Sequence, residues 1–228
     1  MNEQQVGRFF DSLSQDYTAV IERCFPRYRE MLWALLDYLP SDKPFNSIVE
    51  LGSGTGNLSV LIARAFPRAT IRFVDLSGDS LNVCRSRLGH HDRFTFEERD
   101  FRELSYEANS VDLVVSSIAV HHLTSTEKQQ LFSRINGWLS PNGVFSFADQ
   151  FRGATDAIYA RHMHHWRELS SAAGSSGEEW NMWMMHQREH DHHDPLVDQL
   201  GWLAEAGFSQ VDCVWRYLLW AVVQGSKQ

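Results

Sequence analysis

Cysteine is scarce in this sequence. Cys24, Cys84 and Cys213 are the only three in 228 residues, and no two of them form a C-x-x-C pair. An odd, widely spaced set of this kind provides neither a disulfide framework nor a zinc ribbon, and it is typical of a reducing compartment. We therefore expect a cytoplasmic protein.

Long apolar runs are also missing. The longest candidate membrane stretch, 218–223, has six residues, whereas a bilayer-spanning helix needs ~20. The first 30 residues carry acidic and basic side chains throughout, so they contain no apolar stretch of the kind found in signal peptides. These two observations predict a protein without a membrane partner.

Positive charge is in deficit. The chain has 21 Lys and Arg against 29 Asp and Glu, a formal net charge of −8. An acidic surface repels phosphate backbones, so we expect no nucleic-acid partner and favour a small-molecule ligand. Composition leaves a homodimer open. The chain is 43% hydrophobic, which is enough to build one large core.

The middle of the chain alternates short β-branched runs with helical patterns. The expected strands are 47–51, 70–74, 94–97, 111–116 and 144–148, and the expected helices are 57–66, 77–88 and 128–139. This alternation predicts an α/β fold with a doubly wound, mostly parallel sheet. Ligands of such sheets bind beyond the carboxyl ends of the strands, here just after Leu51, Val74, Ser116 and Ala148.

A glycine-rich turn follows the first expected strand. It reads Glu50-Leu51-Gly52-Ser53-Gly54-Thr55-Gly56-Asn57, and glycines there let a ligand approach bare backbone beside a helix N-terminus. A dinucleotide fingerprint G-x-G-x-x-G would need glycine at position 57, so Asn57 argues against NAD or FAD.

Two acidic residues end the next strands. Asp75 comes 75 − 56 = 19 residues after the last glycine of the turn, where a carboxylate can accept both hydroxyls of a ribose. The alternative is that Asp75 only caps the helix that starts near Ser77. After the third strand, Asp100 could accept an adenine amino group while Phe101 covers the base. An ordinary loop aspartate and a core phenylalanine are the other interpretation.

Taken together, these motifs resemble those of class I S-adenosylmethionine (SAM)-dependent methyltransferases. The shared features are the E-x-G-x-G-x-G turn, the two aspartates, the run 111–116 and the segment 139–143 before the fifth strand. The tail, 202–208 followed by expected strands 210–215 and 218–223, is similar to the antiparallel end of that fold, a Rossmann-like seven-stranded sheet. The resemblance implies a SAM cofactor, S-adenosylhomocysteine as product, and cofactor contacts from Glu50, Gly52, Ser53, Gly54, Gly56, Asp75, Leu76, Asp100, Phe101, Ser116 and Tyr17.

The expected organisation is a single domain with four parts. They are an N-terminal helical lid (1–45), a SAM-binding core (46–149), a helical insertion (150–197) and a C-terminal helix with two antiparallel strands (198–228). The flanks, including Phe10-Asp11, are similar to those of small-molecule methyltransferases and of carboxy-SAM synthases. The second resemblance would assign Arg188 to hold a carboxylate, and a carboxy-SAM synthase-like enzyme is therefore an alternative function.

A histidine pair follows the fourth expected strand, where the transferable methyl group of SAM should lie. Methyl transfer from a sulfonium is an in-line displacement, and it needs a base only if the acceptor arrives protonated. Histidine titrates near neutrality, so His121 is the candidate catalytic residue and His122 a candidate substrate contact. The other interpretation is that the pair packs ahead of the helix cap at Thr124.

Seven of the 11 histidines fall between positions 162 and 193. His186 and His190 have i, i+4 spacing, which can place two imidazoles on one metal, and Asp191 is close in sequence. The pattern defines no ligand geometry, so we expect no metal and interpret the segment as a lid in which His165 and Trp183 line the acceptor pocket. A catalytically silent SAM- or metal-binding protein is a further alternative.

Overall fold

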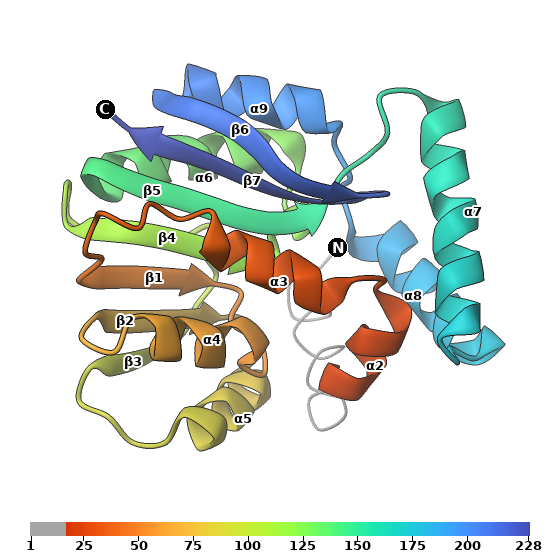
Figure 1. Ribbon diagram of the computed structural model, residues 1–228, viewed down its shortest axis with the longest axis horizontal. Coiled ribbons are helices and arrows are strands. Elements are labelled where there is room, and N and C mark those ends of the chain that lie inside the picture. Colours follow the sequence, from red (N-terminus) through yellow and green to blue (C-terminus); the bar gives the residue numbers. More distant parts are fainter. Residues whose placement is uncertain (1–16) are drawn as a thin grey trace.

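Seven strands form one sheet in the computed structural model, which describes residues 17–228 (Figure 1). They are β1 (Ser47–Leu51), β2 (Thr70–Asp75), β3 (Phe94–Glu98), β4 (Val111–Ser117), β5 (Leu139–Gln150), β6 (Phe208–Tyr217) and β7 (Trp220–Lys227). The order across the sheet is β3-β2-β1-β4-β5-β7-β6, with β7 antiparallel to both β5 and β6. The expected fold class, a doubly wound and mostly parallel sheet, is confirmed.

The described part of the chain also contains eight α-helices and one 3-10 turn. They are α2 (Tyr17–Cys24), α3 (Tyr28–Asp37), α4 (Asn57–Ala65), α5 (Gly78–Leu88), η1 (Val120–His122), α6 (Ser125–Trp138), α7 (Asp156–Ala172), α8 (Gly177–His190) and α9 (Leu196–Glu205). Side-chain caps start several of them: Ser77 accepts from the amide of Ser80, and Thr124 forms a capping box with Glu127.

The core has two halves because alternate strand residues face opposite sides of the sheet. On β4, Leu113 and Val115 face the half formed with α3, α4 and α5, whereas Val114 faces the half formed with α6 and α9. The molecule is therefore a helix–sheet–helix sandwich (Figure 1).

Helices α2, α7 and α8 lie beyond the carboxyl ends of the parallel strands (Figure 1). Large aromatic side chains attach them to the sheet: Phe25 packs against Trp166, Trp183 and Trp220 with ring centroids 5.3–5.7 Å apart. The indole Nε1 of Trp166 also donates to the carbonyl of Cys24 over 2.5 Å. The segment before the last two strands is thus packed over the end of the sheet where ligands of this fold bind.

The strand boundaries at the C-terminus differ from those expected. The last strand was expected at 218–223 but spans Trp220–Lys227, because Leu218 and Leu219 form the hairpin turn and Leu218 has φ +54°. Backbone pairing of β7 with both neighbours carries the strand through polar residues such as Gln224 and Ser226. Apolar patterning alone could not show this extension. Among residues 17–228, no helix is long and apolar enough to cross a membrane.

Candidate active site

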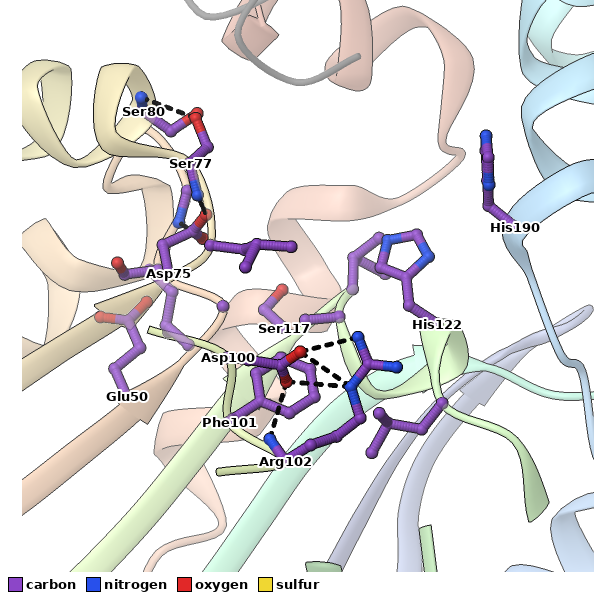
Figure 2. A pocket seen from close by; sticks show the side chains of 18 of the residues that line it. Glu50, Asp75, Ser77, Ser80, Asp100, Phe101, Arg102, Ser117, His122 and His190 are labelled. Carbon is purple, nitrogen blue, oxygen red and sulfur yellow. Dashed lines mark hydrogen bonds and ion pairs between the residues drawn. The ribbon is translucent and has the colours of Figure 1, made fainter. Parts of the chain in front are cut away.

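A cavity of about 490 Å³ opens at the carboxyl ends of β1, β2 and β4, close to the point where the strand order reverses. Figure 2 shows Asp75 and Ser77 on one side, Asp100 to Arg102 along the floor, and His122 and His190 on the opposite side. Of the cofactor residues expected from sequence, those that line the cavity are Glu50, Gly52, Ser53, Gly54, Asp75, Leu76, Asp100 and Phe101.

The glycine turn is held by hydrogen bonds to the end of β2. The amide of Gly52 donates to the carbonyl of Val74 over 2.8 Å, and the amide of Gly54 donates to Oδ2 of Asp75 over 2.7 Å. Gly52 has φ +70°, and a Cβ there would lie 2.3 Å from that of Ala119. A side chain at position 52 is therefore excluded both by conformation and by space.

Gly56 has a different role from the one expected. A Cβ at this position would lie 2.9 Å from Sγ of Cys84, and Gly56 does not line the cavity. Its missing side chain allows α4 and α5 to approach each other beneath the turn. Gly56 thus contributes to the packing of the two helices rather than to the cavity lining.

Asp75 holds two backbone amides, one at the start of α5 and one in the glycine turn. Its Oδ1 accepts from the amide of Ser77 over 2.9 Å at the start of α5, while Oδ2 accepts from Gly54. The carboxylate also lines the cavity. A carboxylate has about four acceptor positions, so it can hold the turn and still accept from a ligand's hydroxyl groups.

Glu50 is the most deeply buried acidic group of the cavity wall, with 1% of its surface exposed. Burial, with a smaller contribution from the nearby charge of Asp75, raises its pKa to about 8, although the hydroxyl of Ser59 opposes the shift. At neutral pH the carboxyl group is mainly protonated. A cationic ligand beside it would favour the ionised form.

Asp100 is engaged by a neighbour that sequence reasoning did not identify. Its Oδ2 lies 2.7 Å from Nη2 of Arg102, and its Oδ1 accepts from the amide of Arg102 over 2.8 Å (Figure 2). Arg102 in turn reaches Glu127 over 3.3 Å. The pair fixes the loop after β3, so that Phe101 lines the cavity.

The serine expected at the methionine moiety of SAM is displaced by one position. Ser116 is fully buried and its hydroxyl donates to the carbonyl of Leu51 over 2.8 Å, which ties β4 to β1. Ser117 lines the cavity instead. Successive strand residues face opposite sides, so an error of one residue reverses the direction of the side chain.

Tyr28 is a cavity residue without an assigned role in the sequence analysis. It begins α3, and its hydroxyl accepts from Nδ2 of Asn57 over 3.4 Å. Burial raises its pKa to about 12, so the phenol stays protonated. The aromatic segment 25–28 was the available signal. Tyr17, also expected near the cofactor, starts α2, but its side chain lies outside the described part of the chain, as does the segment Phe10-Asp11.

His121 and His122 differ in their environments. His122 lines the cavity, whereas His121 is 3% exposed, is not part of the cavity wall, and has its Nδ1 2.5 Å from Oδ1 of Asp149 on β5. Burial alone would lower the pKa of His121, but the carboxylates of Asp149 and Asp191 outweigh it and raise the pKa. Burial lowers the pKa of His122, as does the neighbouring charge of His121. His122, expected as a substrate contact, therefore lines the cavity, whereas His121, expected as the catalytic residue, does not.

Asp191, just after α8, lies among several imidazoles. Nitrogen atoms of His122, His186 and His121 lie 3.3, 3.6 and 3.7 Å from its Oδ1, and Nε2 of His193 lies 3.5 Å from Oδ2. Burial lowers the pKa of His186 to about 3 and also lowers that of His193. The imidazoles of His186 and His193 therefore stay neutral. Burial would raise the pKa of Asp191, but the surrounding histidines outweigh it and hold that pKa well below its usual range.

The segment that carries Asp191 is attached to the rest of the site by three groups. The amide of His192 donates to the carbonyl of His121 over 2.7 Å. Nζ of the buried Lys128 lies 2.6 Å from Oδ2 of Asp194, and the hydroxyl of Ser125 donates to Oδ1 over 2.7 Å. Residues 192–194 are therefore fixed to η1 and α6, and they hold Asp191 beside the histidine pair.

Three residues expected in the acceptor pocket lie outside the main cavity. His165 is half-buried on α7, where its Nδ1 is 3.2 Å from Glu168, and Arg188 is exposed on α8. Trp183 is buried and borders a much smaller space of about 10 Å³ beside Phe25 and His186. Arg102 is the one arginine or lysine among the described residues that line the main cavity. Within the expected helical insertion, 150–197, the residues that line the main cavity are Glu189, His190 and His192.

Comparison with known proteins identifies relatives of the chain. A family described as a methyltransferase domain matches residues 48–143. An uncharacterized methyltransferase of Bacillus mycoides is 30% identical over 151 residues, which cover 65% of this chain and 68% of that protein.

Two solved structures share the fold. A SAM-dependent methyltransferase from Mesorhizobium loti superposes with a TM-score of 0.62 at 23% identity, covering 86% of this chain and 98% of that chain. Phosphoethanolamine N-methyltransferase 2 of Haemonchus contortus, in complex with phosphomonomethylethanolamine and S-adenosylhomocysteine, gives 0.68 at 18% identity, covering 95% of this chain and 58% of that chain. The sheet order and the glycine turn are those of a Rossmann-like methyltransferase fold. The chain belongs to the class I SAM-dependent methyltransferases.

Proposed function

We propose that the protein binds SAM in the main cavity and transfers its methyl group to a small-molecule acceptor. The observation that carries this proposal is the convergence of three strand ends on one space. The turn around Gly54, the carboxylate of Asp75 and the ring of Phe101 all line the same cavity. They offer open backbone, an acceptor for hydroxyl groups and an apolar surface for a base, in the order of the strands β1, β2 and β3.

The charge of the cavity fits a cationic cofactor. Five carboxyl groups line it, and they belong to Glu50, Asp75, Asp100, Glu127 and Glu189. Glu50 is mainly protonated and Arg102 pairs with Asp100 and Glu127, but the other carboxylates still outnumber this one cation and leave the lining negative. SAM carries a positive sulfonium and a positive ammonium group, which such a lining attracts, whereas the pyrophosphate of a dinucleotide would be repelled. This agrees with Asn57 at the position where a dinucleotide fingerprint requires glycine.

When bound, SAM supplies an activated methyl group on sulfur. The protein then has to align the acceptor with that methyl group and to exclude water. The cavity lining is suited to this task, since it combines the apolar Ile118, Ala119 and Leu123 with the polar His122 and Ser117. His122 is the described imidazole from η1 that can contact an acceptor there.

A small-molecule acceptor is supported by the position of α7 and α8. The end of α8 and the segment after it line the cavity with Glu189, His190 and His192, so the protein's own chain bounds the cavity on that side. The Haemonchus contortus relative was solved with the small molecule phosphomonomethylethanolamine. The net charge of −8 also disfavours a nucleic-acid acceptor.

The test is a transfer assay with methyl-labelled SAM and a small-molecule metabolite extract. We expect the label to appear in a low-molecular-weight product only when active protein is present, and to be lost in Asp75→Ala. Label found only on nucleic acid or protein would refute the small-molecule acceptor. Formation of a carboxylated SAM derivative, detected by mass spectrometry, would support the carboxy-SAM synthase alternative instead.

A further inference from the structure

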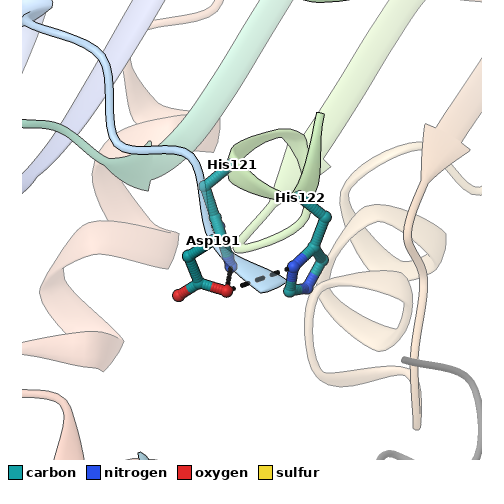
Figure 3. A group of neighbouring side chains, drawn as sticks. All are labelled: His121, His122 and Asp191. Carbon is teal, nitrogen blue, oxygen red and sulfur yellow. Dashed lines mark ion pairs between the residues drawn. The ribbon is translucent and has the colours of Figure 1, made fainter. Parts of the chain in front are cut away.

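Three potential metal-ligand groups meet beside the main cavity. His121 and His122 come from η1 and Asp191 from the segment after α8, and Figure 3 shows the three side chains directed toward one another. One ligand atom from each lies within 4.8 Å of the other two. The group joins positions 69–70 residues apart in sequence, so the tertiary fold creates it.

The spacing within the group also fits the ligands of one ion. Oδ1 of Asp191 lies 3.3 Å from Nδ1 of His122 and 3.7 Å from Nε2 of His121. Charge-assisted hydrogen bonds are shorter, roughly 2.7–2.9 Å. Two ligands on a tetrahedral Zn²⁺, each ~2.1 Å from the metal, are separated by about 3.4 Å. The observed separations are close to that value.

The hydrogen bonding of His121 is that of a metal-binding imidazole. Its Nδ1 lies 2.5 Å from Asp149, a partner that fixes the ring and leaves Nε2 directed toward Asp191. Histidines that bind metals commonly have a carboxylate on the second ring nitrogen, which orients the ring and makes the ligand more basic. Asp149 is 2% exposed and well placed for this role.

Further nitrogen donors surround the same carboxylate. Nε2 of His186 lies 3.6 Å from Oδ1 of Asp191, and Nε2 of His193 lies 3.5 Å from Oδ2. The nearby cation, Lys128, is directed to Asp194 rather than to Asp191. Imidazole and carboxylate ligands together suit first-row divalent ions such as Zn²⁺.

We propose that His121, His122 and Asp191 bind a divalent transition metal ion, with Zn²⁺ as the representative species, and that one coordination position faces the cavity. The open position follows from His122, which is both a ligand and part of the cavity wall. Three protein ligands with an exchangeable fourth are typical of catalytic rather than structural zinc sites. The metal would hold the nucleophilic oxygen or sulfur of the acceptor and favour its deprotonated form, a role that rests on the proposed methyl transfer.

The first experiment measures Zn²⁺ binding by calorimetry on the full chain after treatment with EDTA and dialysis. We expect one equivalent to bind, and the affinity to fall more than ~100-fold in His122→Ala and Asp191→Asn. Removing a ligand costs more than removing a hydrogen-bond partner of a ligand, which typically lowers affinity roughly 10–100-fold. Asp149→Asn should lower the affinity for Zn²⁺ by less than these two variants do. The matched controls His165→Ala and Asp198→Asn, both at helix positions outside the group, should bind like the wild type.

The second experiment uses Co²⁺ on the wild-type protein, so that it does not depend on a variant that folds. We expect the intense visible bands of four-coordinate Co²⁺, and a new near-ultraviolet charge-transfer band on addition of 2-mercaptoethanol as the thiolate enters the open position. Weak six-coordinate bands, no Zn²⁺ binding, or equal affinity in Asp191→Asn would overturn the site. Strong four-coordinate bands that the thiol leaves unchanged would overturn the open position.

S-Adenosylhomocysteine binding, measured on the same samples, separates this inference from the proposed function. If the protein binds S-adenosylhomocysteine but fails to bind Zn²⁺, the metal site is refuted and the cofactor proposal stands. If the protein binds Zn²⁺ but fails to bind S-adenosylhomocysteine, the cofactor proposal is refuted and the metal site stands. A variant that no longer binds Zn²⁺ but keeps wild-type affinity for S-adenosylhomocysteine is folded. Its failure to bind Zn²⁺ then supports the metal site.

Discussion

The backbone amide of Gly54 donates a hydrogen bond to Oδ2 of Asp75 over 2.7 Å, and this bond joins the glycine turn after β1 to the end of β2. The other oxygen of Asp75 accepts from Ser77 at the start of α5. One carboxylate therefore positions two backbone segments of the cavity wall while it faces the cavity itself.

Replacement of Asp75 by alanine should weaken S-adenosylhomocysteine binding roughly 10- to 100-fold, because hydrogen bonds to a charged group contribute about 1.5–3 kcal/mol. Asp79→Ala is the matched control, since Asp79 is exposed on α5 four residues away. Isothermal titration calorimetry on both variants checks this. Equal affinities would contradict the role of Asp75 in the cofactor site.

Gly52→Ala should destabilise the protein by about 2–5 kcal/mol, from the left-handed φ and from the overlap with Ala119. Gly54→Ala has open space at its Cβ and should cost only about 1–2 kcal/mol from its φ of +51°. The double variant Gly52→Ala/Ala119→Gly should recover part of the loss. Urea denaturation gives these free energies, and no recovery in the double variant would argue against the steric explanation.

Glu50 should make the free energy of unfolding depend on pH. Because burial raises the pKa of Glu50 to about 8, the folded protein holds this proton more tightly than the unfolded chain does. The resulting stabilisation is complete below about pH 4.5 and is lost as the pH rises through 8. At ~1.4 kcal/mol per pKa unit it is on the order of 5 kcal/mol.

As the pH is raised from 5 to 8.5, the free energy of unfolding should therefore fall less in Glu50→Gln than in the wild type. Urea denaturation at several pH values measures this. Glu103→Gln, at an exposed position, serves as the control and should follow the wild type. If Glu50→Gln keeps the full pH dependence of the wild type, another group is responsible.

Much of this cavity could be predicted from the sequence because the relevant residues follow strands directly. The E-x-G-x-G-x-G turn, Asp75 and Phe101 each come at the end of a strand whose apolar pattern is easily recognised, and parallel strands end at one edge of the sheet. The error at Ser116 arose at the same place, since periodicity locates a strand more reliably than it fixes which residue faces the ligand.

The histidine group could not be predicted in the same way. The i, i+4 spacing of His186 and His190 does bring their rings together on α8, with centroids 4.9 Å apart, but it could not show that His186 also lies 3.6 Å from Asp191. The residues that meet are His122 and Asp191, which are distant in sequence and are brought together by hydrogen bonds of 192–194 to η1 and α6. Sequence patterns carry no information on contacts of this kind.

Trp166 should be essential for the attachment of α7. It is 2% exposed, its ring packs 5.1 Å from that of Trp220, and its indole donates to Cys24. Trp166→Ala should cost about 3–5 kcal/mol and expose the helices to protease. Trp33→Ala, at a tryptophan that is 55% exposed, should change stability by less than about 0.5 kcal/mol. Similar losses in the two variants would contradict the account of this packing.

The central claim is that the cavity at the ends of β1 and β2 is a SAM site, and calorimetric titration of the wild-type protein with S-adenosylhomocysteine tests it most directly. The account predicts one binding site per chain, lost or strongly weakened in Asp75→Ala and unchanged in Asp79→Ala. No binding to correctly folded wild-type protein, or the same affinity in Asp75→Ala, would contradict it.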